Sequence, residues 1–196
     1  MRPRRSSPVP AKLISGYETV LAVPATMVNG EPHAITATGF VPASAITSAA
    51  LNLYQGITTG AHAQGGAGGN LSCAILDDLN LGLTDSDTDD SKTICSKGTT
   101  ETPTFYNFDA EVNILRDEDL VAVGLYNLAR DLTRAPDVEY LLVHRARGGK
   151  DSSEPFAIGD EVDVYYVHTD NPVPVFGDGE YQALSLGFIP KGWVNV

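Results

Sequence analysis

The stretch DEDLVAVGLYNLARDLT, from Asp117 to Thr133, decides the fold class, because its apolar residues recur at helical spacing while the chain around it alternates. Its acidic start and basic end suit the dipole of a helix, and Pro136 stops the helix from continuing. The apolar stripe consists of Leu120, Val121, Leu125, Leu128 and Leu132. The sequence therefore predicts one packing α-helix in a chain that is otherwise mainly β.

Strand-like alternation lies on both sides of this helix. The clearest strand runs from Thr104 to Leu115, and from Tyr106 to Ile114 apolar residues at even positions alternate with polar residues at odd ones. A short helix is expected within residues 42–51, capped by Ser44, and Asn29-Gly30 marks a turn. Further strands are expected at 17–23, 34–40, 71–76, 79–83, 138–147, 161–168 and 181–189. This pattern predicts a β-sandwich or small barrel with one flanking helix and long loops.

The charge is distributed unevenly along the chain. Residues 1–16, rich in Pro, Ser and Arg, are predicted to form a flexible N-terminal arm, and residues 17–196 a single domain. The chain has 13 basic and 25 acidic residues, a net charge of −12. Four of the basic residues precede the first acid, Glu18, so the remainder carries −16. This acidic remainder of the chain should not bind nucleic acid tightly, because binding to phosphates needs clustered Lys and Arg. It suits either a surface past which DNA slides or simple solubility.

Several protein classes are not supported. The sequence has no run of about 20 apolar residues, which a membrane-spanning helix requires. The basic N-terminus lacks the apolar segment of a signal peptide. Cys73 and Cys95 lack the C-x-x-C spacing of zinc and redox motifs, and they are expected to be buried free thiols rather than a disulfide.

Two segments are candidates for contacts with other chains. The tract from Pro32 to Leu76 contains no Asp, Glu, Lys or Arg. It suits either a surface that faces another chain, because interface centres are depleted of charge, or an ordinary strand pair with a loop. Within it, the glycine-rich stretch that includes Gly56, Gly65 and Gly69 is expected to be a mobile loop that orders on a neighbour.

A second loop carries Asp85, Asp87, Asp89 and Asp90. Aspartate at alternate positions resembles the start of a calcium-binding loop, but Asp90 stands where such a loop needs glycine, and Ser96 where it needs a bidentate glutamate. A solvated acidic loop is the expected structure, and calcium binding is left open.

No catalytic, cofactor or metal site emerges from the motifs, so the protein is predicted not to be an enzyme. None of the four histidines, His33, His62, His144 and His168, has the spacing of a zinc-enzyme motif. His144 and His168 lie on expected strands, where they could meet across a sheet or serve as structural histidines. No G-x-S-x-G nucleophile turn is present.

The C-terminal half carries a specific succession of segments: TPTFYNFDAEVNILRDED at 102–119, then the helix, then APDVEYLLVHRARGGKDSSEPFAIGDEVDVYYVHTDNPVPV at 135–175 and GEYQALSLGFIPKG at 179–192. This succession resembles the major tail tube proteins of long-tailed bacteriophages, particularly those that infect actinobacteria. The resemblance covers about residues 70–192 and extends more loosely toward the N-terminus.

The resemblance implies a structural virion protein, made in the cytoplasm of the host bacterium, whose six-membered rings stack into a hollow tail tube. DNA would pass through the tube without specific binding, and the partners would be copies of the chain, the tape measure, the tail terminator and distal tail proteins. Acids expected to face the lumen are Asp109, Glu111, Glu161 and Asp163. Residues expected to lie between rings are Gly56, Gly65, Gly69, Asp85, Asp87 and Asp89.

Three alternatives remain at this stage. The chain could be another virion β-domain, such as a tail terminator, head–tail connector or capsid decoration protein. It could be a carbohydrate-binding β-sandwich, although Trp193 is its single tryptophan. It could be an enzyme whose catalytic residues come together only in the fold.

Overall fold

The computed structural model describes residues 18–36, 39–56, 68–76, 79–84, 87–90, 101–105, 108–119, 121, 124–145, 150–176 and 181–195, and only the backbone at 87–90, 101–105 and 193–195. The strands, in chain order, are β1 (Thr19–Val28), β2 (Glu31–Thr36), β3 (Gly39–Pro42), β4 (Gly69–Asn70), β5 (Asn80–Leu83), β6 (Asp87–Asp90), β7 (Glu101–Phe105), β8 (Phe108–Leu115), β9 (Glu139–Arg145), β10 (Asp163–Thr169), β11 (Val173–Val175) and β12 (Ala183–Asn195). The helices are η1 (Ala43–Ala45), α1 (Ser48–Asn52), η2 (Ser72–Ala74) and α2 (Leu125–Thr133).

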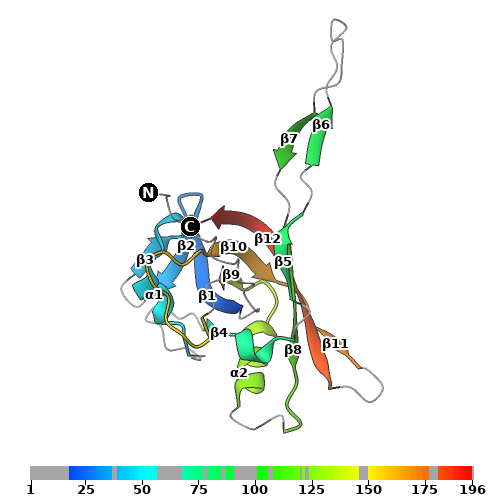
Figure 1. Cartoon of the computed structure of the whole chain (residues 1–196). Coiled ribbons are helices and arrows are strands. Elements are labelled where there is room, and N and C mark those ends of the chain that lie inside the picture. The colour runs from blue at the N-terminus through cyan, green and yellow to red at the C-terminus, as the bar shows by residue number, and fades with distance from the viewer. Residues whose placement is uncertain are drawn as a thin grey trace, which may run out of the picture.

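The strands form one curled antiparallel sheet and a separate hairpin (Figure 1). The sheet has the order β3-β2-β1-β9-β10-β12-β8-β5, with β4 paired to β1 and β11 paired to β12. Strands β6 and β7 pair only with each other, and this hairpin projects from the body in Figure 1. The prediction of a mainly β fold with a packing helix is confirmed.

The central strands β1, β9 and β10 are buried on both faces, so the subunit has two cores. One core contains Leu142, Tyr165 and Val112, and it is covered by residues of α2. The other contains Leu141, Val143 and Tyr166, and it is covered by α1 and the segment before β10. Successive side chains of these strands point into opposite cores, because side chains of a β-strand alternate between the two faces of the sheet.

Of the strand predicted from Thr104 to Leu115, Thr104 and Phe105 belong to β7 in the separate hairpin, and the prediction is correct for β8. Its residues alternate between buried and accessible along its whole length. The register pairs Glu111 with Gly187 and Asn113 with Ser185, so the accessible residues of β8 and β12 share one face. The opposite face joins the first core.

The helix prediction is correct only for its second half. Helix α2 begins at Leu125 rather than Asp117, and its N-cap is Gly124, in an extended conformation. Upstream, the carboxylate of Asp117 accepts a hydrogen bond from the backbone of Asp119, and Asp119 does the same for Val121. Such local side-chain bonds compete with helical hydrogen bonding, so the acidic stretch turns instead of starting the helix.

Four smaller expectations are wrong. The single strand expected at 34–40 is divided between the end of β2 and the start of β3, which pair with each other. The strand expected at 71–76 is the short helix η2, because the Asn70 side chain accepts hydrogen bonds from the backbone and hydroxyl of Ser72 and bends the chain. The cap of α1 is Thr47 rather than Ser44, and its Oγ1 accepts from the backbone of Ala50. Cys73 is exposed rather than buried. Cys95, His62 and the predicted arm at 1–16 lie outside the described residues.

We predict that Gly68→Ala destabilises the subunit by roughly 1–3 kcal/mol, because overpacking in a filled interior costs about that much. A Cβ at Gly68 would lie 2.6 Å from the carbonyl oxygen of Ala22 and 2.6 Å from Cδ of Pro24. Urea unfolding measures the effect. Gly82→Ala is the matched control, since a Cβ there meets nothing within 4 Å. Equal unfolding midpoints for the two variants would contradict the prediction.

Candidate assembly surfaces

The β6–β7 hairpin is the first candidate surface, and it carries part of the predicted acidic loop. Asp87 and Asp89 lie on β6, opposite Phe105 and Thr102 of β7. The backbone is therefore a paired strand at these positions, whereas a calcium-binding loop curls around its ion. Asp85 lies outside the described residues. Among the described strands β6 and β7 pair only with each other, so each keeps an outer edge without a ladder partner, which favours contact with another molecule (Figure 1).

The accessible face of β8 is the second candidate. It holds Asp109 and Glu111, both exposed, and the carboxylate of Glu111 accepts a hydrogen bond from the Ser185 hydroxyl at 2.8 Å. The residues opposite these two acids in β5 are Gly82 and Asn80. The structure therefore brings two of the four predicted lumen acids together on a face of small and polar residues.

The other two predicted acids lie elsewhere in the sheet. Asp163 opens β10 opposite His144, on the face that Tyr165 shares with the first core. Glu161 precedes that strand and is exposed. Asp109 and Glu111 point away from the same core, so the four acids do not share one face.

The glycine-rich loop is anchored at its ends. Gly56 is exposed after α1, whereas Gly69 is buried in β4 opposite Ala22. The side-chain amide of Asn70 donates to the carbonyl oxygen of Ser152, which ties this end of the loop to the segment before β10. Gly65 lies outside the described residues.

The histidines hold structural contacts. His144 contacts the carboxylate of Glu18 at 3.2 Å, and His168 contacts Asp137 at 3.0 Å and Glu139 at 3.4 Å. The two rings do not face each other, because the register places His144 opposite Asp163 and His168 opposite Glu139. In the part of the chain that the structure describes, no group of three or more His, Cys, Asp or Glu residues could hold a metal ion.

Arg145 organises the segment between β9 and β10, and the sequence analysis did not single it out. Its side chain is only 1% exposed, yet Nη2 donates to Thr19 Oγ1 and to the carbonyl oxygens of Asp151 and Glu154. Nη1 donates to Asp160 at 3.3 Å, and the guanidinium lies 4.5 Å from the centre of the Phe156 ring. One buried cation thus fixes the path of a loop with little secondary structure.

Asp160 is the anionic partner in this network. Burial raises the pKa of its carboxyl group, but hydrogen bonds from Lys150, from the backbone of Ala157 and from Arg145 outweigh burial, so its pKa lies below the usual value of 3.8. Lys150 Nζ contacts both carboxylate oxygens, at 2.7 and 2.9 Å.

On the other side of the sheet, burial raises the pKa of Tyr140 to about 12, and its hydroxyl donates to the carbonyl oxygen of Leu132 in α2.

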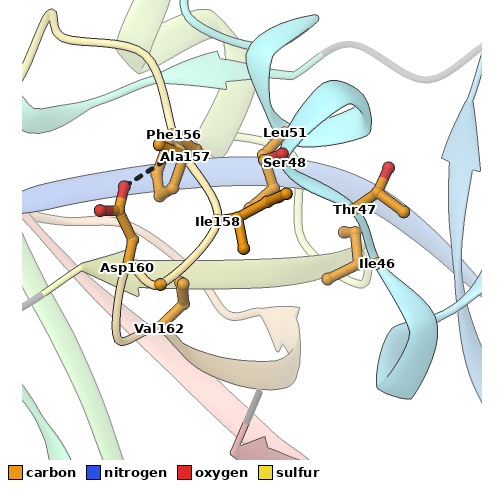
Figure 2. A pocket seen from close by; sticks show the side chains of 10 residues that line it. Ile46, Thr47, Ser48, Leu51, Phe156, Ala157, Ile158, Asp160 and Val162 are labelled. Atoms are coloured by element: carbon orange, nitrogen blue, oxygen red, sulfur yellow. Dashed lines mark hydrogen bonds between the residues drawn. The ribbon is translucent and has the colours of Figure 1, made fainter.

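The same segment borders a hollow of about 410 Å³. Figure 2 shows Ile158 between α1 and the side chains of Phe156 and Val162, with Asp160 turned toward Ala157. Ile158 is fully exposed, and Asp160 is the one titratable residue in the lining. Because Asp160 is already engaged, the hollow offers apolar contact area rather than reactive groups.

The chain matches the family model for phage tail tube proteins over residues 15–195. It belongs to that family. A comparison with curated proteins found no match. Membership makes the chain a structural protein of the virion tail, in a family that is structural rather than enzymatic. Among the described residues of this tail tube protein, no helix is long and apolar enough to cross a membrane.

We expect Asp160→Asn to destabilise the tail tube subunit by roughly 2–4 kcal/mol at neutral pH, because it removes the charge that faces Arg145 and Lys150. The folded-state pKa of Asp160 is lowered, so its carboxylate stabilises the subunit fully above the usual value of 3.8 and less as the pH falls through the folded-state pKa. Urea unfolding across this acid range measures the difference.

Glu161→Gln is the matched control, because Glu161 is the exposed neighbour and its carboxylate belongs to none of these contacts. The wild type and the control should lose stability together in acid, while Asp160→Asn should show a flatter pH dependence. An Asp160→Asn variant as stable as the control at neutral pH would contradict the role given to this network.

Proposed function

We propose that this protein assembles into six-membered rings that stack into the phage tail tube, a conduit through which DNA passes without specific binding. The observation that carries the proposal is the open sheet: its order ends in β3 on one side and β5 on the other, and a hairpin projects beyond it (Figure 1). The family match supports the tube, and the ring number of six rests on the resemblance of the sequence.

Within a ring, the ends of the sheet supply the lateral contacts. Edge strands leave a row of backbone donors and acceptors without a ladder partner, and strand addition from a neighbour pairs them. A contact between unlike edges is heterologous, and it generates a ring when the rotation between subunits closes. The sheets of neighbouring subunits then continue around the lumen.

Exposed apolar side chains support burial against further copies. Val173, Phe176 and Tyr181 are 59%, 66% and 85% exposed around β11 and the start of β12, and Ile158 is exposed beside its hollow. Large apolar side chains as exposed as these are the kind that a protein interface can bury. On this proposal, the predicted arm at 1–16 and the loop with Gly56 and Gly65 join the contacts between stacked rings.

The placement of the acids supports one face of β8 as the lumen lining. Asp109 and Glu111 share a polar face of β8, and repeated around a ring this face would repel the phosphates of passing DNA. Glu161 and Asp163 belong to another part of the sheet, so we rank them below the β8 pair. The tape measure, tail terminator and distal tail proteins are the further partners in the virion.

We predict that the purified protein forms stacked tubes, and that removal of the hairpin leaves rings that do not stack. Leu83 lies opposite Phe108 in the ladder, so joining Thr84 to Asn107 through Asn-Gly closes β5 and β8 with a two-residue turn. Negative-stain microscopy and light scattering separate rings from tubes, and circular dichroism checks the fold. Tubes of normal length without the hairpin would contradict its role. A wild type that forms closed rings only would favour a terminator or connector instead.

The lumen assignment has its own test. We expect tubes of the Asp109→Lys/Glu111→Lys variant to trap a short single-stranded oligonucleotide during assembly and protect it from nuclease, because the basic face attracts phosphate. Tubes of the wild type and of Glu161→Lys/Asp163→Lys should protect none. Protection by the second pair rather than the first would assign the lumen to β10, and protection by neither would place all four acids outside it.

A further inference from the structure

Residues 173–176, the β11 tip, are all apolar and all exposed. Among the described strands β11 pairs only with β12, so its outer edge has no ladder partner. Pro174 lies in the middle of this strand, and a proline has no N–H to offer to a further strand. The β11 tip is therefore better suited to contact through its side chains than to extension of the sheet.

The hollow beside α1 is the matching concave surface. Its apolar lining consists of Ile46 and Leu51 on one wall and Phe156, Ile158 and Val162 on the other (Figure 2). Ile158 is fully exposed, so no described part of the subunit covers it. The volume of about 410 Å³ lies within the range of pockets that enclose small molecules, so one aromatic side chain fits.

Both surfaces are neutral, although the net charge of the chain is −12. The α1 wall belongs to the tract from Pro32 to Leu76, which has no charged residue, and residues 171–176 have none either. Asp160, the charged residue in the lining, is held by Lys150 and Arg145. Interface centres are depleted of charge, and neutral surfaces approach each other without the repulsion between acidic parts of two copies. The two surfaces therefore suit each other better than either suits the acidic remainder of a neighbour.

We infer that the β11 tip of one copy docks in the hollow beside α1 of the next copy in the same ring, with Phe176 seated against Ile158. The inference rests on the proposed function and names the side-chain contact at its lateral interface. Phe176 is the largest side chain of the β11 tip and is 66% exposed. A large apolar anchor that fills a pocket is the kind of contact that carries much of the affinity of an interface.

The topology places the two surfaces at opposite ends of the sheet. The lateral interface of the proposed function joins the β5 end of one sheet to the β3 end of the next. The β11 tip lies in the half that ends in β5, because β11 and β8 both pair with the first residues of β12. The α1 wall lies at the β3 end, because η1 and α1 directly follow β3 along the chain. One lateral approach therefore brings the β11 tip and the hollow together.

A subunit cannot make this contact with itself. The ladder pairs Val173 with Ser185 and Val175 with Ala183, which fixes the β11 tip to β12. Figure 1 shows β11 and α1 on opposite sides of the body. A tip and a hollow are unlike surfaces, so the contact is heterologous, and every subunit of a closed ring supplies one of each.

The test places one charge on each surface and then pairs the two charges. Ile158 and Phe176 are exposed, so substituting either should leave the free subunit folded, which circular dichroism checks. Ile158→Asp and Phe176→Lys should each lower the fraction of subunits in rings or tubes at least tenfold at a fixed protein concentration, because each buries an unpaired charge. The double variant Ile158→Asp/Phe176→Lys should assemble at least threefold better than either single variant, since its charges then face each other across the contact. Sedimentation velocity measures the fractions.

Val121→Asp and Val121→Lys are the matched controls, since Val121 is also highly exposed and lies on neither surface. Both should assemble within twofold of the wild type. Wild-type assembly by either Ile158→Asp or Phe176→Lys would overturn the inference and leave the proposed function standing, as would a double variant no better than the single ones.

The predicted arm at 1–16 is the other candidate occupant of the hollow. An effect of Ile158→Asp that disappears when residues 1–16 are deleted would assign the hollow to the arm and overturn the inference. An effect of the same size in the shortened chain supports the β11 tip. A wild type that forms neither rings nor tubes would overturn the proposed function, and this inference with it.

Discussion

The antiparallel ladder between β8 and β12 is the interaction on which one half of the subunit, formed by β5, β8, β11 and β12, depends. Its register places Leu186 opposite Val112 and Leu184 opposite Ile114, so that apolar residues of both strands share one face. A slip of one residue would turn Asp109 and Glu111 into the core, and burying unpaired carboxylates costs several kcal/mol. The same ladder sets the position of Arg116, whose backbone N–H donates to the carbonyl oxygen of Gln182 at 2.9 Å. Both the acidic face of β8 and the position of Arg116 follow from this one register.

The half of the subunit that contains β1, β9 and β10 is built differently, and the difference determines which half is available for assembly contacts. Strands β1, β9 and β10 have a core on each face, and Arg145 holds the covering segment through contacts that need no partner subunit. Strands β8 and β12 have a core on one face only along their shared ladder. Stability is therefore concentrated where no other copy is needed, while the half with the free face, the hairpin and the exposed tip of β11 remains available for contact.

Local patterns in the sequence predicted the elements whose structure is local. The alternation from Phe108 to Leu115 matched the strand and its faces, and Asn29-Gly30 formed a turn because both residues adopt positive φ, 52° and 85°. The prediction of helix α2 was correct only in its second half. In the sequence, an acidic segment looks the same whether its carboxylates lie at the start of a helix or accept hydrogen bonds from the neighbouring backbone, as those of Asp117 and Asp119 do. Local pattern cannot decide between these outcomes, since their energies are similar.

The candidate surfaces needed the tertiary fold. The pairing of Arg145 with Asp160 spans 15 residues of loop, and a single arginine in a strand pattern carries no signal of its partners. Arg116 lines one hollow with Arg130 and Arg134 because α2 packs beside β8. The four lumen candidates were drawn from two strands whose acidic positions look equivalent in the sequence. The strand register separated them, because Asp163 shares a face with Tyr165 while Asp109 and Glu111 face away from that core.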